Sequence, residues 1–291
     1  MKKGKQMSED AEVRSGPYIG KELSKHSFVV DEPTLASYYA GLELTRPGKV
    51  DALTPSLIAS GPDNAPFGEI AFDNHMGHLW MRQEWALYSP LQAGEQYVTG
   101  GRITDIYQKR DRNVVRYSVE VHDAAGNLMV ATQHHQSFLL ERPSGEVTFR
   151  DPQAKAGARK FIIPKGERVQ PLERTITLAM CDDFWQGDKN YHSNREESEK
   201  LGFKDVVVGG RMTQPYIASL LEDRYGTSWW NSGHLDIKFT NPVWLGDTIT
   251  AHGVETGVSV DDPKRTSVFL WISKSDDTVV LIANASVENP D

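Results

Sequence analysis

The sequence has a single cysteine, no long apolar run and no cluster of basic residues. Because Cys181 is the only cysteine among 291 residues, neither an intrachain disulfide nor a cysteine-based metal site can form, which fits a reducing intracellular compartment. Apolar stretches such as residues 278–283 are far shorter than the roughly 20 residues that cross a membrane. The lysines near the N-terminus precede polar residues rather than the apolar core of a signal peptide. We therefore expect a cytoplasmic protein without a membrane span.

The patterns of charge and of glycine argue against two further kinds of partner. Lys and Arg number 32 against 40 Asp and Glu, a net charge of -8, so no basic surface is available for nucleic acid. No glycine-rich phosphate-binding motif stands between a predicted strand and a predicted helix, so no nucleotide cofactor is indicated. With 38% hydrophobic and 25% charged residues, the chain has the composition of a globular protein.

The chain contains an internal repeat. A proline, three residues, a glycine and an acid precede a predicted strand at 89–97, and the same pattern recurs at 241–249, an offset of 152. Upstream, residues 54–60 match residues 213–219 at an offset of 159, with Thr, Ile, Ala and Ser identical. Two matches in the same order and at similar offsets predict two related structural units.

Each unit ends in a predicted three-stranded antiparallel meander. Segments of alternating polarity, separated by turn sequences, predict strands at 97–107, 113–122, 128–140, 248–258, 266–273 and 278–287. A helix is predicted ahead of the second meander at 212–225, ending at Gly226. Its counterpart at 52–60 is cut short by Gly61 and Pro62, so the first copy of this helix is degenerate.

Motifs of the second unit resemble those of a known family. They are Gly187-Asp188-Lys189-Asn190-Tyr191-His192, Leu201-Gly202-Phe203, Val208-Gly209-Gly210-Arg211-Met212-Thr213, and Asn241-Pro242-Val243 with Gly246-Asp247. This set resembles the MaoC-like family of R-specific enoyl-CoA hydratases and acyl dehydratases, whose pattern is Gly-Asp-x-Asn-Pro-Ile-His, then Gly-Phe, then His-Gly-Met-Leu-Thr. The chain departs from that pattern in two places. Its Asp-to-His interval is one residue shorter and lacks the proline, and Gly209 stands where the family has histidine.

The resemblance implies an α+β double hot-dog fold, in which each repeat wraps a curved antiparallel sheet around a central helix, the first helix being shortened. It implies an N-terminal repeat at 15–142 that binds the acyl chain and a catalytic C-terminal repeat at 174–291. The segment 143–173, rich in proline, glycine and basic residues, is predicted to link them. Residues 40–49 of the first repeat hold no histidine and no pair of acids, so we expect one catalytic site per chain.

The activity implied by the resemblance is the addition or removal of water on an α,β-unsaturated or 3-hydroxy acyl thioester. Coenzyme A would be part of the substrate, with no metal or redox cofactor. This reaction needs an acid and a base, and His192 and Asp188 are the candidates. It also needs donors for an enolate-like oxygen, for which the backbone at Gly210 and Gly209, where the helix begins, is suited. Asn194 and Tyr191 flank the histidine and could contact substrate.

Simpler interpretations of the same residues stay open. Asn194 could cap a helix at 195–201, Tyr191 could be a packing residue, and Gly209-Gly210 could be a tight turn. Four further histidines do not have the spacing of a zinc site and are interpreted as surface or core residues: His75, His78, His134 and His135.

Two other functions also stay open: a hot-dog acyl-CoA thioesterase and a non-catalytic acyl-binding subunit. In each case the partner is an acyl thioester. Because curved sheets have edges that oligomers often cover, we expect a homodimer or a higher homo-oligomer.

Overall fold

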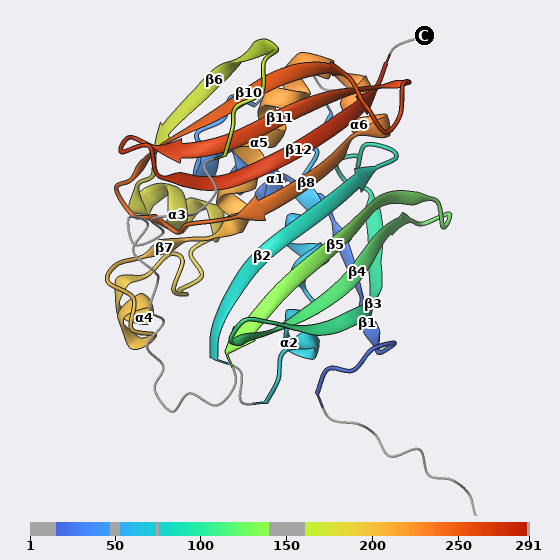
Figure 1. Cartoon of the computed structure of the whole chain (residues 1–291). Helices are drawn as coiled ribbons and strands as arrows, with labels where there is room; N and C mark the ends of the chain where they lie inside the picture. The colour runs from blue at the N-terminus through green and yellow to red at the C-terminus, as the bar shows by residue number, and fades with distance from the viewer. Residues whose placement is uncertain (1–15, 47–52, 74–75, 140–160, 290–291) are drawn as a thin grey trace, which may run out of the picture.

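The computed structural model describes residues 16–46, 53–73, 76–139 and 161–289. Within these ranges ten strands form one antiparallel sheet, with the order β1-β3-β4-β5-β2-β8-β12-β11-β10-β6. The strands are β1 (Glu22–Val29), β2 (Met76–Leu87), β3 (Gln96–Lys109), β4 (Arg112–Asp123), β5 (Leu128–Leu139), β6 (Glu167–Thr175), β8 (His234–Phe239), β10 (Thr248–Val258), β11 (Arg265–Lys274) and β12 (Val279–Glu288). Figure 1 shows α5 and α1 behind this sheet.

The strand order is the same when it is followed inward from either edge of the sheet. From one edge it runs β1-β3-β4-β5-β2, and from the other β6-β10-β11-β12-β8. The two halves join where β2 pairs with β8, from Arg82 opposite Lys238 to Ala86 opposite His234 (Figure 1). This arrangement confirms the duplication predicted from the sequence and gives the double hot-dog fold.

One helix also occupies an equivalent position in the two repeats. In each repeat a helix follows the first strand: α1 (Glu32–Leu42) in the first and α3 (Leu178–Phe184) in the second. Their N-caps, Asp31 and Thr177, accept hydrogen bonds from backbone amides three residues later. The other helices are α4 (Arg195–Lys200), α5 (Gly210–Tyr225) and α6 (Thr227–Ser232).

The central helix of the second repeat begins two residues earlier than predicted. It starts at Gly210 rather than at Met212, and it ends at Gly226 as expected. Pro215 therefore lies in the second turn, where it supplies no amide hydrogen to the carbonyl of Arg211. The earlier start places the Gly209-Gly210 pair at the N-terminus of the helix.

Two segments differ from their predicted form. In place of a helix at 52–60, the described residues form the short turns η1 (Ile58–Ser60) and η2 (Pro62–Asn64), followed by α2 (Phe67–Ile70). Most of the predicted linker at 143–173 lies outside the described residues, as do the N-terminal residues 1–14 and His75. The last part of the linker, however, belongs to β6, an edge strand that tolerates Pro171 because only one of its sides is paired.

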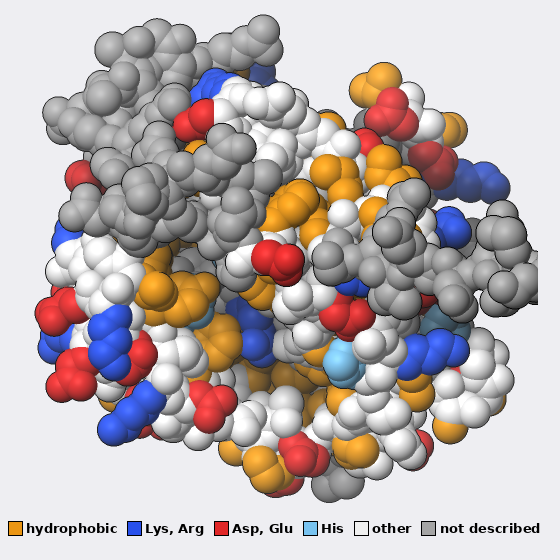
Figure 2. Space-filling view, turned by 90° about the horizontal axis from the view of Figure 1, so that it is seen from below, with side chains coloured by type: hydrophobic (Ala, Val, Ile, Leu, Met, Phe, Trp, Pro, Cys, Tyr) orange, Lys and Arg blue, Asp and Glu red, His pale blue; other side chains and the backbone are white. Residues whose placement is uncertain are grey.

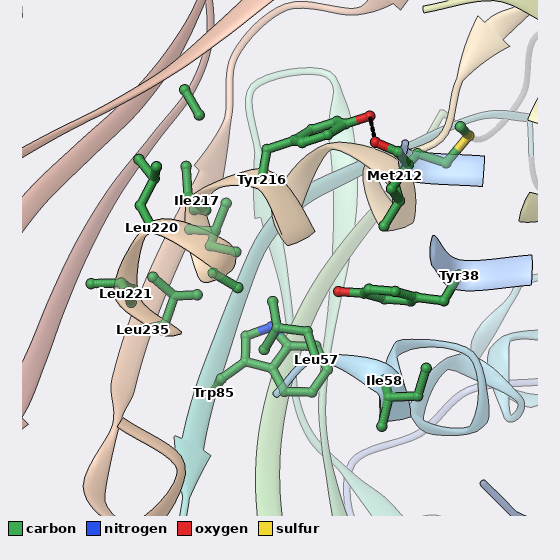
Figure 3. Packing of buried hydrophobic residues seen from close by; sticks show 14 of the residues in the cluster. Tyr38, Leu57, Ile58, Trp85, Met212, Tyr216, Ile217, Leu220, Leu221 and Leu235 are labelled. Atoms are coloured by element: carbon green, nitrogen blue, oxygen red, sulfur yellow. Dashed lines mark hydrogen bonds between the residues drawn. The ribbon is translucent and has the colours of Figure 1, made fainter. Parts of the chain in front are cut away.

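The core lies between the sheet and α5, whose apolar residues are buried along its whole length. Figure 3 shows Leu57 and Trp85, which come from the first repeat, on one side of α5, and Tyr216 on the other side of the helix. The hydroxyl of Tyr216 donates to the carbonyl of Leu42 at 3.2 Å. Packing across the repeats fixes the position of the helix that opens at Gly210. Within the described ranges, no helix is long and apolar enough to cross a membrane.

Candidate active site

His192 lies in the loop between α3 and α4, and hydrogen bonds within that loop fix its place. The side-chain oxygen of Asn190 accepts from the backbone amide of His192 at 2.8 Å. The Ser193 hydroxyl donates to the backbone carbonyl of Asp188. The imidazole itself reaches the carbonyl of Val207, 2.6 Å from Nδ1. Because a carbonyl only accepts, Nδ1 carries the hydrogen, and Nε2 of the neutral ring keeps its lone pair.

The surroundings of His192 favour this neutral, basic form. Burial lowers the pKa of His192 to about 4, against the opposing effect of the hydrogen bond to Val207, and the positive charge of nearby groups at His78 and Arg211 lowers it further. The indole of Trp185 stacks on the imidazole, with ring centroids 5.1 Å apart and planes 12° apart. At neutral pH the ring is therefore uncharged and can accept a proton at Nε2.

The start of α5 lies beside this imidazole. A Cβ atom on Gly209 would be 3.4 Å from Cε1 and Nδ1 of His192, and one on Gly210 would be 3.1 Å from the ring of Trp80. Glycine at both positions leaves room for these rings against the start of α5. The first amides of a helix lack the partner that a preceding turn would supply, and the helix dipole favours negative charge there. The binding of an oxyanion by the amides at Gly209 and Gly210 stays a prediction.

The other predicted site residues have different positions. The carboxylate of Asp188 is exposed and makes no hydrogen bond or ion pair to any residue the structure describes. The structure therefore does not bring Asp188 into contact with His192, and its catalytic role stays a prediction. Asn194 caps α4 through its side-chain oxygen, which accepts from the amide of Glu197 at 3.1 Å. Tyr191 packs between His192 and Phe203, with ring centroids 3.9 Å and 5.9 Å away.

A buried polar cluster of the first repeat lies close to these residues, and no local sequence pattern indicates it. We call it the Asp63 cluster: Asp63, Gln83, Tyr117 and His134. One oxygen of the Asp63 carboxylate, Oδ2, accepts from Gln83 at 2.7 Å and lies 3.0 Å from Nε2 of His134, whose imidazole is stacked between Tyr117 and Trp80. Trp80 in turn covers Gly210. His134 is thus a core residue, as interpreted, but it supports the wall of the site.

Arg211 is the second residue that sequence reasoning missed. It follows Gly210 on α5, and its guanidinium carbon lies 4.7 Å from the ring centroid of Trp185 and 5.6 Å from that of Phe184. Burial lowers the pKa of Arg211, an effect that the charge of Asp63 opposes. Figure 2 shows a recess in which hydrophobic side chains surround a basic one. Across the described ranges, no three His, Cys, Asp or Glu side chains are grouped to hold a metal ion.

Comparisons with known proteins agree with the double hot-dog fold. Residues 161–270 match the family model described as MaoC like domain. A solved structure named MaoC-like dehydratase superposes with a TM-score of 0.73 at 15% identity, covering 94% of this chain and 98% of that one. A MaoC-like dehydratase from Phytophthora capsici gives 0.71 at 16% identity, covering 94% and 97%. Peroxisomal multifunctional enzyme type 2 from Drosophila melanogaster gives 0.69 at 16% identity, covering 92% of this chain and 48% of that one.

No curated protein matches the chain in sequence. The C-terminal half of the chain contains a MaoC-like domain. The whole chain has the fold of structures named MaoC-like dehydratase.

Proposed function

We propose that this protein is a hydratase or dehydratase that adds or removes water at the double bond of an α,β-unsaturated acyl thioester, with coenzyme A as the thiol carrier. The observation that carries the proposal is the neutral imidazole of His192 beside the open N-terminus of α5. The MaoC-like domain at 161–270 supports the same reaction class.

In the hydration direction, Nε2 of His192 takes a proton from water while the water oxygen forms a bond to the β-carbon. The electron pair of the double bond moves toward the thioester carbonyl, and the enolate oxygen accepts hydrogen bonds from the first amides of α5, at Gly210. The imidazolium of His192 then gives up this proton as the α-carbon receives one, so that one water is added in all and the neutral imidazole is restored. Dehydration is the same sequence reversed.

Asp188 is proposed as the partner that orients the water or delivers the second proton. Because its carboxylate is exposed, it has to turn toward His192 to do so. The first repeat is proposed to form one side of the acyl pocket. Trp80 comes from that repeat and lies against Gly210, which supports this role.

The test is a panel of trans-2-enoyl thioesters with alkyl, branched, dicarboxylic and aromatic acyl groups, followed by loss of the conjugated absorbance. A hydratase consumes at least one member and forms the 3-hydroxy product without releasing free thiol. Release of coenzyme A would instead establish hydrolysis, which is the thioesterase alternative. Tight binding with no turnover of any member would contradict the proposal and favour a binding subunit.

A further inference from the structure

Arg211 is a half-buried basic side chain in the candidate site without an ion-pair partner among the described residues. Its Nε is buried and has no hydrogen-bond partner, and no carboxylate of the described residues forms an ion pair with its guanidinium. Enclosing an arginine in this way opposes folding, because a buried charge is stabilised only by pairing or hydrogen bonding. The family pattern quoted above has methionine at this position. An arginine that lowers stability here therefore calls for a ligand that compensates it.

The backbone is shaped to hold the guanidinium in place. A Cβ atom on Gly61 would lie 2.5 Å from Nη2 of Arg211, so a side chain there would displace the guanidinium from this position. On its other side the guanidinium rests on the rings of Trp185 and Phe184. Trp185 is also the ring that stacks on His192, so Arg211 and the candidate base share one neighbour.

Asp63 is the acid whose charge acts on Arg211, and only one of its two carboxylate oxygens has hydrogen-bond partners, while Oδ1 is buried without one. Oδ2 of Asp63 is bonded within the Asp63 cluster, and the carboxylate is more than ion-pair distance from Arg211 although its charge is felt there. Two further buried donors around the site have no partner among the described residues, the indole nitrogens of Trp80 and Trp185. A saturated alkyl group in the same space would leave all these donors without a hydrogen-bond partner, which is unfavourable for buried polar groups.

We infer that Arg211 binds a carboxylate carried by the acyl group, so that the substrate is the coenzyme A monothioester of an unsaturated dicarboxylic acid. The inference rests on the proposed function, because it places the acyl group beside His192. A guanidinium fork fits a carboxylate with two parallel hydrogen bonds. The position beside His192 assigns the anion to the acyl group rather than to the phosphates of coenzyme A, which a long pantetheine arm separates from the thioester.

The first experiment measures binding and needs no turnover. Non-hydrolysable coenzyme A thioethers are compared by calorimetry, one with a carboxylate-terminated chain and one with the isosteric amide. The wild type is expected to prefer the carboxylate by about 10- to 100-fold, the usual strength of hydrogen bonds to a charged group. In Arg211→Met the ratio falls to about one. Arg102→Met removes the same charge from an exposed position on β3 and keeps the preference.

Gly61→Ala is the second variant. Its backbone, with φ at -78°, accepts alanine, while the new methyl group displaces the guanidinium and leaves the charge in the protein. The preference for the carboxylate is expected to fall in this variant as well. Thermal unfolding of Arg211→Met, expected at the same or a higher temperature than wild type, shows that lost binding does not reflect lost folding.

Three results would overturn the inference: equal binding of the two thioethers to the wild type, an unchanged preference in Arg211→Met, or weaker binding of free coenzyme A to Arg211→Met, which would assign Arg211 to a phosphate. The failure of the proposed function is distinguishable. A carboxylate preference that depends on Arg211 without turnover of any enoyl thioester would keep the anion site and reject the hydratase. Turnover of enoyl thioesters without any preference for the carboxylate would keep the hydratase and reject the anion site.

Discussion

If His192 is the catalytic base, its protonation should set the pH dependence of the proposed reaction. With a pKa of about 4, an imidazole is about 97% neutral at pH 5.5, whereas at the ordinary value of about 6.5 it would be about 9% neutral. If the neutral ring is the base, kcat/KM at pH 5.5 should be close to its value at pH 7. With an unperturbed histidine as the base, kcat/KM at pH 5.5 would be about a tenth of its value at pH 7.

The measurement is kcat/KM between pH 4 and 8 at constant ionic strength, with the enoyl thioester that the panel selects. The acid limb should have its midpoint near 4, because this limb reports the base of the free enzyme. A midpoint near pH 6.5 would show that burial does not lower the pKa of His192. Circular dichroism at each pH separates loss of activity from unfolding.

The lowered pKa of His192 also makes the stability of the folded chain depend on pH, and the direction of this dependence follows from the direction of the shift. The pKa is lower in the folded chain, so between about pH 6.5 and 4 the unfolded chain takes up a proton at His192 that the folded chain does not. The contribution of this residue to stability therefore falls as the pH is lowered through that window. The activity profile is best recorded with short exposures at the acid end.

Three further predictions concern catalysis, stability and stoichiometry. His192→Ala should lower kcat by about 10² to 10⁴ with the fold intact, and Asp188→Asn should lower it less; near wild-type activity in His192→Ala would contradict the assignment. Burial raises the pKa of Glu222 to about 7, so its contribution to stability is lost as the pH rises from about 4.5 through 7, and Glu222→Gln should raise the unfolding temperature more at pH 8 than at pH 5. An equal gain in unfolding temperature at pH 5 and pH 8 would contradict the raised pKa of Glu222. A non-reactive acyl-CoA analogue should saturate at one equivalent per chain, and two equal sites would argue for a functional first repeat.

The features that were predicted well are those with a local signature. Strand β10 (Thr248–Val258) has the predicted bounds, and the other meander strands differ by one or two residues at their ends. Alternation of polarity and turn residues lie within a few positions of each other, so a single sequence is enough to read them. The capping of α4 by Asn194, left open beside a role in substrate binding, is local in the same way.

The parts of the site that were missed depend on contacts between distant residues. Asp63 and His134 are separated by 71 positions, and nothing in either neighbourhood indicates that they meet. Asp63 stands in a Pro-Asp-Asn turn that is typical of surface loops, yet it is fully buried. Arg211 belongs to the motif at 208–213, but residue spacing does not indicate that its side chain lacks a hydrogen-bonding partner in the fold. The exposed position of Asp188 likewise depends on how the loop folds.

The seam where β2 pairs with β8 has a consequence for ancestry. Taken alone, each half of the sheet would have an unpaired edge strand here, β2 in the first half and β8 in the second. These two strands occupy equivalent places in the duplicated strand order. A gene for one repeat would therefore encode a chain that closes its sheet only against a second copy, as an isologous dimer. Fusion of two such genes makes that pairing intramolecular and frees each copy to change on its own. In this chain the second repeat has the long helix α5, while the corresponding part of the first repeat has the short turns at Gly61 and Asp63.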